Sequence, residues 1–286
     1  MASLSVRARG YLLINYVPAL YRDNPLVVIP TTSHTHIRIK LSALPNEGVS
    51  DDVNVSIQAP LPNDLTKACS DLIREFVIKV FNEVGFRGNV SIKVSSSKPQ
   101  QLKLIYVLTT NYLINLLCGE LTKELIDSIC SLDKLLKLGN DVLALRYTTL
   151  CRGRPMIWRL GEGYLCHESK VVVDIEKIFY VPCRDGCVNE AVIKEFPNSI
   201  TNALVHLVGA AGIEIFRKLN YSSDYLKSLL KIVGSLNYLV LNDEVAHELI
   251  KLYSRELCDI RSDERYCIIT QDIGNVAEVI SFRITY

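Results

Sequence analysis

A run of hydroxyl side chains and one lysine stands between a predicted strand and the most apolar predicted helix of the chain. The run consists of Ser95, Ser96, Ser97 and Lys98. The strand covers residues 90–94 and the helix covers residues 101–118. Hydroxyls, a lysine and a helix N-terminus can together hold a phosphate group. The alternative, which the residues themselves favour, is an ordinary polar loop in which a serine caps the helix.

Cysteines and one histidine form a weaker candidate for a metal site. Cys183 and Cys187 are four positions apart, and Cys166 and His167 precede them. Zinc sites usually repeat two close pairs of the Cys-x2-Cys type, which this spacing does not match. We therefore expect no metal site, and a disulfide between Cys183 and Cys187 is the competing interpretation.

Composition limits the class of protein. Of the 286 residues, 49% are apolar and 22% are charged, which is typical of a globular chain with a sizeable core. The formal net charge of +1 argues against a protein built for nucleic acid, although a local basic patch can exist within a balanced total.

The lack of a recognisable targeting signal and the pattern of cysteines favour a cytoplasmic protein. The N-terminus lacks the apolar segment of a signal peptide, and the apolar run at residues 102–118 is interrupted and too short to span a bilayer. We therefore expect no membrane association. The nine scattered cysteines suit buried thiols in the cytosol, or a thermophile that tolerates intracellular disulfides, and the scarcity of Gln, Met and Trp favours a thermophile.

Periodicity and turn residues predict the elements that position these side chains. Helices are expected at residues 65–84, 101–118, 123–136, 197–219, 224–239 and 244–257. Strands are expected at residues 9–15, 26–29, 35–41, 53–57, 90–94, 141–150, 155–160, 164–166, 170–174, 177–182, 265–271 and 276–286. This order predicts an α+β chain in two lobes, with domains at residues 1–155 and 156–286.

Several segments together resemble the GHMP kinases, the superfamily of galactokinase, homoserine kinase, mevalonate kinase and phosphomevalonate kinase. Residues 6–14 resemble the opening strand of the family, and residues 24–30 its next strand. Residues 85–92, followed by Pro99, resemble the approach to its phosphate loop, and residues 139–141 resemble its Gly-x-Asp motif. The resemblance implies an N-terminal lobe like domain 2 of ribosomal protein S5 and a C-terminal α/β sandwich lobe.

The resemblance also implies roles for two charged residues. Asp141 stands at the position of the family's catalytic base, which accepts a proton from a substrate hydroxyl during phosphoryl transfer. Arg9 stands where the opening strand usually carries a Lys or Arg that assists the phosphate. The competing interpretations are a polar residue capping a loop for Asp141 and a solvent-facing arginine for Arg9.

The glycine-rich loops of the family are missing. Residues 100–105 and residues 261–265 contain no glycine, although the family uses glycines in both places. We therefore expect the loop at residues 95–99 to lead straight into an ordinary helix, leaving a space narrower than a triphosphate needs. One phosphate or sulfate could bind at the first turn, assisted by Lys98 or Lys103.

These observations support two classes of function. One is an ATP-dependent kinase of a small hydroxylated metabolite, similar to mevalonate or phosphomevalonate kinase, with ATP and Mg²⁺ as cofactors. The other is a non-catalytic relative that serves as a binding or oligomerisation module, with a homodimer as a possible assembly. A decarboxylase of the same superfamily would share the ATP and the Asp, so the sequence does not separate it from the kinase.

Overall fold

The computed structural model describes residues 2–17, 20, 24–43, 52–183, 194–220, 224–239, 266–272 and 276–286. The chain forms two compact units, each built from two segments that are separate in sequence. Unit 1 contains Met1–Gly10 and Ser33–Leu150, and unit 2 contains Tyr11–Thr32 and Cys151–Tyr286. The α+β class is as predicted. The sequence predicts two domains, at residues 1–155 and 156–286, each formed by one continuous segment. That division into domains stays a prediction.

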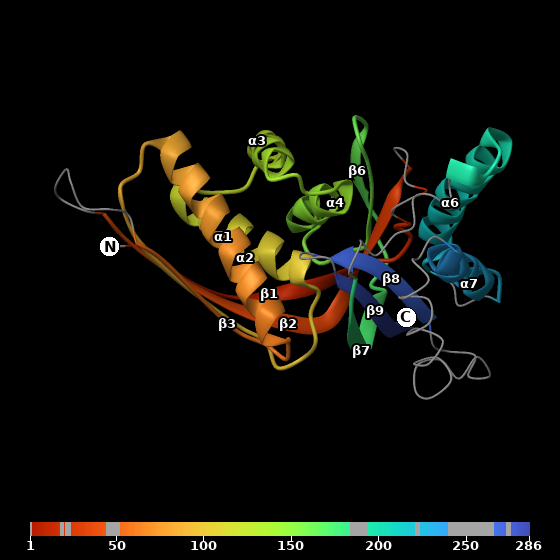
Figure 1. Ribbon diagram of the computed structural model, residues 1–286, viewed down its shortest axis with the longest axis horizontal. Helices are drawn as coiled ribbons and strands as arrows, with labels where there is room; N and C mark the ends of the chain where they lie inside the picture. Colours follow the sequence, from red (N-terminus) through yellow and green to blue (C-terminus); the bar gives the residue numbers. More distant parts are fainter. Residues whose placement is uncertain are drawn as a thin grey trace. The chain divides into compact units, whose positions relative to one another are not determined.

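Unit 1 is a four-stranded sheet with helices on one face (Figure 1). Its strands belong to β1 (Ala2–Leu13), β2 (Leu26–Ala43), β3 (Val53–Gln58) and β4 (Gly88–Ser95), in the order β3-β4-β2-β1. β2 and β4 are antiparallel, whereas β3 and β4 are parallel. Parallel strands need a crossover connection, and helix α1 (Asn63–Val84) supplies it.

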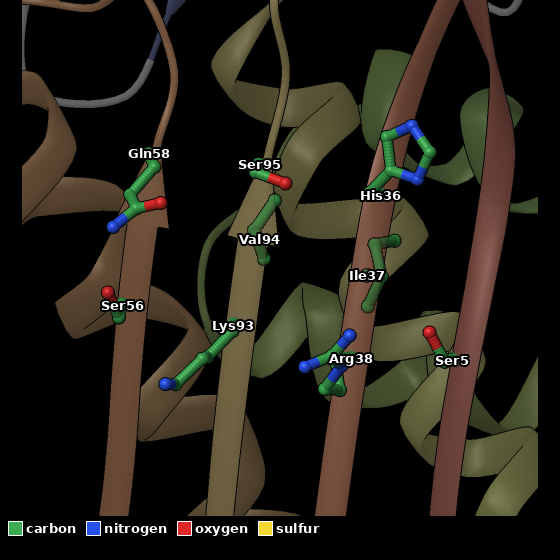
Figure 2. Close-up of a pocket in the computed structure, with 9 residues that line it drawn as sticks. All are labelled: Ser5, His36, Ile37, Arg38, Ser56, Gln58, Lys93, Val94 and Ser95. Carbon is green, nitrogen blue, oxygen red and sulfur yellow. The ribbon is translucent and has the colours of Figure 1, made fainter.

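The two faces of this sheet differ in chemistry. Along β2, Ile37 and Ile39 are buried, whereas His36 and Arg38 are exposed, which is the period-two pattern that the sequence predicts. Figure 2 shows His36 and Arg38 on the face that the helices do not cover.

The helical layer of unit 1 adds α2 (Leu102–Cys118), α3 (Lys123–Leu135) and α4 (Asn140–Tyr147) to α1. The predicted C-cap of α1 is confirmed, because Gly85 has a φ of 65°, a conformation that suits glycine. Helix α2 buries residues on nearly all of its sides, which explains why its sequence is so uniformly apolar.

The strand predicted at residues 141–150 is wrong. These residues form α4 and the short helix η2 (Thr148–Cys151). All side chains of residues 142–145 are buried, and a short apolar run without periodicity does not distinguish a strand from a buried helix.

Two pairs of predicted strands are single strands in the structure. The strands expected at residues 26–29 and 35–41 join as β2, because the threonines between them favour extended backbone. The strands expected at residues 170–174 and 177–182 join as β7 (Val172–Pro182), with a shift of register between Ile175 and Lys177. The helix predicted at residues 244–257 and the loop at 261–265 lie outside the described residues.

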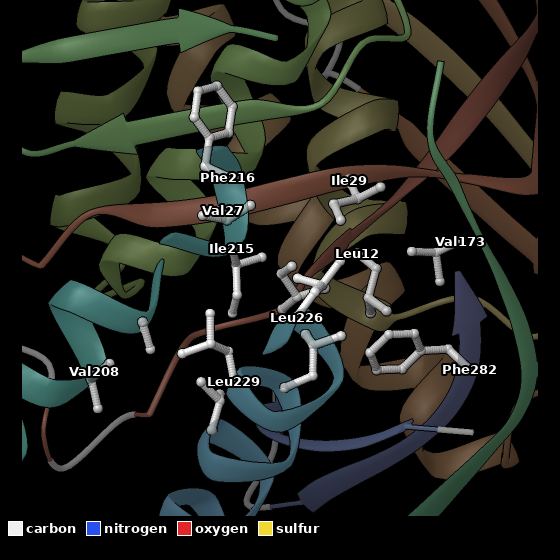
Figure 3. Close-up of a cluster of buried hydrophobic side chains, with 14 of the residues drawn as sticks. Leu12, Val27, Ile29, Val173, Val208, Ile215, Phe216, Leu226, Leu229 and Phe282 are labelled. Carbon is white, nitrogen blue, oxygen red and sulfur yellow. The ribbon is translucent and has the colours of Figure 1, made fainter. Parts of the chain in front are cut away.

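Unit 2 packs helices against strands that are mostly antiparallel; the exception is the parallel pairing of β2 with β7 at Thr31 and Val173. It contains β5 (Met156–Arg159), β6 (Gly163–Cys166), β7, β8 (Tyr266–Asp272), β9 (Val276–Thr285), α6 (Asn198–Lys218) and α7 (Asp224–Leu239). The order β7-β9-β8 is antiparallel throughout, and β8 and β9 form the terminal strand pair that the sequence predicts. Figure 3 shows its core, where Ile215 of α6 and Leu226 of α7 lie near Leu12 and Phe282.

Helix α6 is the one helix among the described residues that is long and apolar enough to cross a membrane. Its residues Val205, Val208 and Ile215 belong to the hydrophobic core of unit 2. A core helix passes the same test of length and composition, so this finding is weak evidence for a membrane span.

An ion pair removed from solvent holds three helices of unit 1 together. Arg146 of α4 and Asp133 of α3 are both fully buried, and two nitrogens of the Arg146 guanidinium each donate to a different Asp133 oxygen at 2.7 Å. The third donates to Thr110 Oγ1 at 2.5 Å and Asn111 Oδ1 at 2.7 Å, both on α2. Each buried polar group thus has a partner, which such a pair requires to be tolerated.

Aromatic rings complete the surroundings of this pair. The Arg146 guanidinium lies 5.0 Å from the ring centroids of both Phe76 and Tyr106. The Tyr106 hydroxyl donates to Asp133 at 2.7 Å, and burial raises its pKa so that it keeps its proton. Burial acts to lower the pKa of Arg146, but the charge and hydrogen bonds of Asp133 outweigh it and raise the pKa.

Cys166, one of the cysteines considered for metal binding, forms a disulfide bond. Cys151 and Cys166 are bonded across 15 residues, with their Cα atoms 5.5 Å apart. This pairing could not be predicted from the sequence, because isolated cysteines carry no information on their partners. Cys183 is also disulfide-bonded, but Cys187 lies outside the described residues, so the pairing expected between them stays a prediction.

His167, which follows the disulfide-bonded Cys166, contacts neighbouring residues through both a hydrogen bond and its ring. Its Nδ1 accepts a hydrogen bond from the Ser169 backbone N–H at 3.0 Å, and its ring packs edge-on against Phe216. Burial lowers the pKa of His167, while nearby Glu168 opposes the shift. The described residues contain no group of three potential metal ligands.

We predict that Arg146→Met lowers the free energy of unfolding by about 3–5 kcal/mol, because it leaves the Asp133 charge buried without a partner. The matched control is Arg74→Met, which removes a half-buried arginine of the same unit that pairs with Asp71 at 2.6 Å and donates to the Val53 carbonyl at 3.2 Å. The control should change stability by less than about 1 kcal/mol. Urea denaturation measures both, and equal losses would contradict a central role for the buried pair.

We also predict that His167 makes unit 2 less stable in acid. A histidine whose pKa is lowered in the folded state does not change the free energy of unfolding when the pH is above its unfolded pKa, because it is then neutral in both states. As the pH falls below that value, the unfolded state takes up a proton first, and stability decreases. His167→Gln should therefore reduce the loss of stability between pH 7 and pH 5, measured by urea midpoints, whereas exposed His206→Gln should leave it as in the wild type.

Candidate functional site

The first turns of α2 and α4 meet at one ion pair in unit 1. Lys103 Nζ lies 2.5 Å from Asp141 Oδ2. Lys103 is the second residue of α2, and Asp141 is the second residue of α4, whose N-cap is the extended residue Gly139. The pair is largely enclosed, because the side chain of Asp141 is 4% exposed and that of Lys103 is 16% exposed. Solvent therefore reaches the pair from the side of the lysine.

The second oxygen of Asp141 takes no part in this ion pair. Asp141 Oδ1 is buried and has no hydrogen-bond partner among the described residues. A buried carboxylate oxygen without a partner costs stability, and native proteins rarely retain one without a reason. Asp141 Oδ1 is therefore an acceptor that these residues leave unused.

Two helix N-termini and Lys103 place positive charge around this carboxylate. A helix N-terminus carries partial positive charge, so a lysine there is unfavourable unless something balances it. The first turn of α2 contains no acidic residue, and Asp141 supplies the balance from α4. Two helix N-termini and one lysine thus surround a single carboxylate.

The buried network fixes where this carboxylate lies. Arg146 is five residues after Asp141 on α4, and its side chain is bonded to α2 and α3. In return, the Arg146 backbone carbonyl accepts from Asn111 Nδ2 at 3.3 Å. Arg146 therefore holds the short helix α4 against α2, and the start of α4 against Lys103.

The predicted serine loop runs directly into the helix, as expected. β4 ends at Ser95 and α2 begins at Leu102. Among the described residues, the non-glycine residues with positive φ are Lys137 and Arg152, so the loop at residues 95–101 has ordinary backbone geometry. The expectation that the space is too narrow for a triphosphate stays a prediction.

The serines of this loop have different environments. The Ser96 hydroxyl donates to the backbone carbonyls of Lys98 at 2.8 Å and His34 at 3.3 Å, which ties the loop to β2. Ser97 and Lys98 are exposed. Ser95 is half-buried at the end of β4 and lines a cavity with residues of β1, β2 and β3. The Ser96 geometry therefore supports a loop-stabilising role for that hydroxyl.

Arg9, the other residue that the resemblance assigned, is exposed on β1 between buried Ala8 and Gly10. Its role in assisting a phosphate stays a prediction. The side-chain partner of Asp141 is Lys103. Sequence reasoning placed Lys103 near an anion but did not pair it with Asp141. One feature of the sequence could have indicated this pairing. The first turn of the buried helix α2 contains a lysine but no acidic residue to balance it.

These residues do not by themselves form a magnesium site. Mg²⁺ requires six oxygen ligands in octahedral geometry, whereas one oxygen of Asp141 already contacts an ammonium group. No cluster of three His, Cys, Asp or Glu side chains occurs in the described part of the chain.

Comparison with solved structures finds similar architectures, among them a mevalonate kinase and mevalonate diphosphate decarboxylases. Mevalonate kinase from L. major, solved with R-mevalonate, has a TM-score of 0.58 at 12% identity, over 98% of this chain and 88% of its own. Mevalonate diphosphate decarboxylase from Staphylococcus aureus has a TM-score of 0.55 at 10% identity, over 98% and 87%. The decarboxylase from Enterococcus faecalis has a TM-score of 0.53 at 11% identity, over 98% and 88%.

Sequence comparison adds no further relative, because no protein-family model and no curated protein matches the chain. Both kinds of structural neighbour are members of the GHMP kinase superfamily. Identities this low support a conclusion about the fold only. The chain has the fold of the GHMP kinases, as the resemblance predicted.

Proposed function

We propose that this protein transfers a phosphoryl group from ATP to a hydroxyl group of a small metabolite similar to mevalonate or its phosphates. The observation that carries the proposal is the Lys103–Asp141 pair, with its buried and unpartnered Oδ1. The fold supports it, because structural neighbours include a kinase solved with R-mevalonate and a decarboxylase solved with MVAPP, AMPPCP and magnesium.

The proposed chemistry assigns one role to each member of the pair. The substrate hydroxyl donates a hydrogen bond to Asp141 Oδ1 and loses its proton to that oxygen as its own oxygen attacks the γ-phosphorus. The bond from the γ-phosphorus to the bridging oxygen breaks, and ADP leaves. Lys103 keeps the carboxylate oriented and places a positive charge where negative charge develops.

Nucleotide binding would depend on charge more than on a glycine loop. The first turns of α2 and α4 supply positive potential, and Lys103 is the partly exposed cation between them. Any Mg²⁺ would then arrive as MgATP, as part of the substrate. Such an enzyme would work in the cytoplasm, where ATP is present.

A specific observation supports the non-catalytic alternative. The loop at residues 95–101 has no glycine and no residue of positive φ, so its backbone does not converge on a triphosphate as a glycine-rich loop does. In that case Lys103 and Asp141 would be a stabilising contact between helices, and the protein would bind a partner or a metabolite without turnover.

We predict that Asp141→Asn reduces kcat for ADP formation by roughly 10²–10⁴-fold, the range expected when a general base is lost. The KM for MgATP should change little, because the amide keeps the shape of the side chain. The assay supplies MgATP with mevalonate, phosphomevalonate or mevalonate diphosphate, and detects phosphorylated product and carbon dioxide separately.

The matched control is Asp71→Asn, which removes an exposed carboxylate of the same unit and should retain wild-type activity. Absence of ADP formation by the wild type with every substrate would favour the non-catalytic alternative. Release of carbon dioxide with ADP would assign the decarboxylase reaction instead.

A further inference from the structure

The uncovered face of the unit 1 sheet has an unusual charge pattern. Its strands, at residues 2–10, 33–43, 53–58 and 88–95, contain no Asp or Glu, although the chain as a whole has 31 acidic and 32 basic residues. The exposed positions of these strands carry Arg7, Arg9, Arg38, Lys40 and Lys93. This face is therefore cationic within a protein that is nearly neutral.

Two of these cations stand directly opposite each other. Arg38 of β2 and Lys93 of β4 are register partners in the antiparallel pair, and His36 is the partner of Ser95 two residues away. Like charges at directly opposed positions destabilise a sheet. Neither Arg38 nor Lys93 has an ion-pair partner in the part of the chain that the structure describes. The sheet thus carries a repulsive pair that its own residues do not balance.

A cavity of about 280 Å³ lies at this pair. It is lined by Ser5, His36, Ile37, Arg38, Ser56, Gln58, Lys93, Val94 and Ser95. Figure 2 shows the side chains of Lys93 and Arg38 on neighbouring strands, with Ser56 and Ser5 on the strands outside them. The polar lining offers hydroxyl, amide, guanidinium and ammonium donors and no carboxylate.

We propose that this cavity binds the phosphate group of a small ligand, with Arg38 and Lys93 as its charged contacts. A phosphate would neutralise the repulsive pair and accept charge-assisted hydrogen bonds from both side chains. Hydroxyl groups of Ser5, Ser56 and Ser95 surround these charges and suit the remaining phosphate oxygens or a polar ester group.

The size and chemistry of the face favour a small phosphate over a nucleic acid. The four strand segments contain no Phe, Tyr or Trp, and sequence-tolerant binding of single strands relies on aromatic side chains that stack on bases. The cavity is also separate from the Lys103–Asp141 pair, which belongs to the helical layer on the other side of the sheet.

Calorimetric titration of the full chain with inorganic phosphate and with glycerol 3-phosphate tests the proposal. We expect both ligands to bind the wild type, and Arg38→Gln and Lys93→Gln each to weaken binding by about tenfold or more, which corresponds to roughly 1.4 kcal/mol. The matched control, Lys40→Gln, removes a charge from the same strand and face outside the cavity, and should weaken binding less than about threefold.

Two further measurements make the result specific. Lys103→Gln should leave intact the phosphate binding that depends on Arg38 and Lys93, so failure of the catalytic proposal would not affect this one. The urea midpoints of Arg38→Gln and Lys93→Gln should equal or exceed that of the wild type, because each removes a repulsion. Tighter binding of the ester than of inorganic phosphate would indicate an organic ligand, and equal binding would indicate free phosphate; both support the cavity.

Other outcomes would overturn the proposal. A phosphate site would be excluded if the wild type showed no binding at ligand concentrations up to about 10 mM. A site with a Kd of about 1 mM, or roughly −4 kcal/mol, would be detected in that range. Equal weakening by Lys40→Gln and Arg38→Gln would show diffuse attraction to a basic surface, and loss of binding in Lys103→Gln would place the phosphate in the helical layer.

Discussion

The buried pair of Arg146 and Asp133 is the interaction on which unit 1 depends. A guanidinium without water is tolerated only when each nitrogen finds an acceptor, and here those acceptors come from α2 and α3. Satisfying them leaves the eight-residue helix α4 little freedom to shift or rotate. Since α4 also carries Asp141, the same requirement determines where the candidate base lies. Stability and the geometry of the site are therefore linked through one side chain.

The sequence was sufficient for elements with strong periodicity or clear end signals, such as α1 with its C-cap at Gly85. It failed where burial removes periodicity, as in α4, and where isolated cysteines pair, as Cys151 does with Cys166. At the site, the motif around Asp141 was visible in the sequence. Its pairing with Lys103 was not, because that contact spans 38 positions and depends on how α2 packs against α4.

The candidate site shows how a phosphate could be bound without glycines. A glycine-rich loop offers many backbone amides, whereas this chain offers two helix N-termini and the ammonium of Lys103 around one carboxylate. The uncovered sheet face uses a different solution, with Arg38 and Lys93 forced into proximity by strand register. This sheet face places unbalanced charge where the fold itself gains nothing from it.

Calorimetric titration with MgATP tests the central claim most directly, which is that the start of α2 and α4 binds nucleotide phosphates. We predict a Kd below about 1 mM, or roughly −4 kcal/mol, and at least about tenfold weaker binding by Lys103→Met. Lys123→Met removes an exposed lysine from the first turn of α3 and should bind as the wild type does. Absence of binding by the wild type, or equal affinity of the wild type and Lys103→Met, would contradict the account.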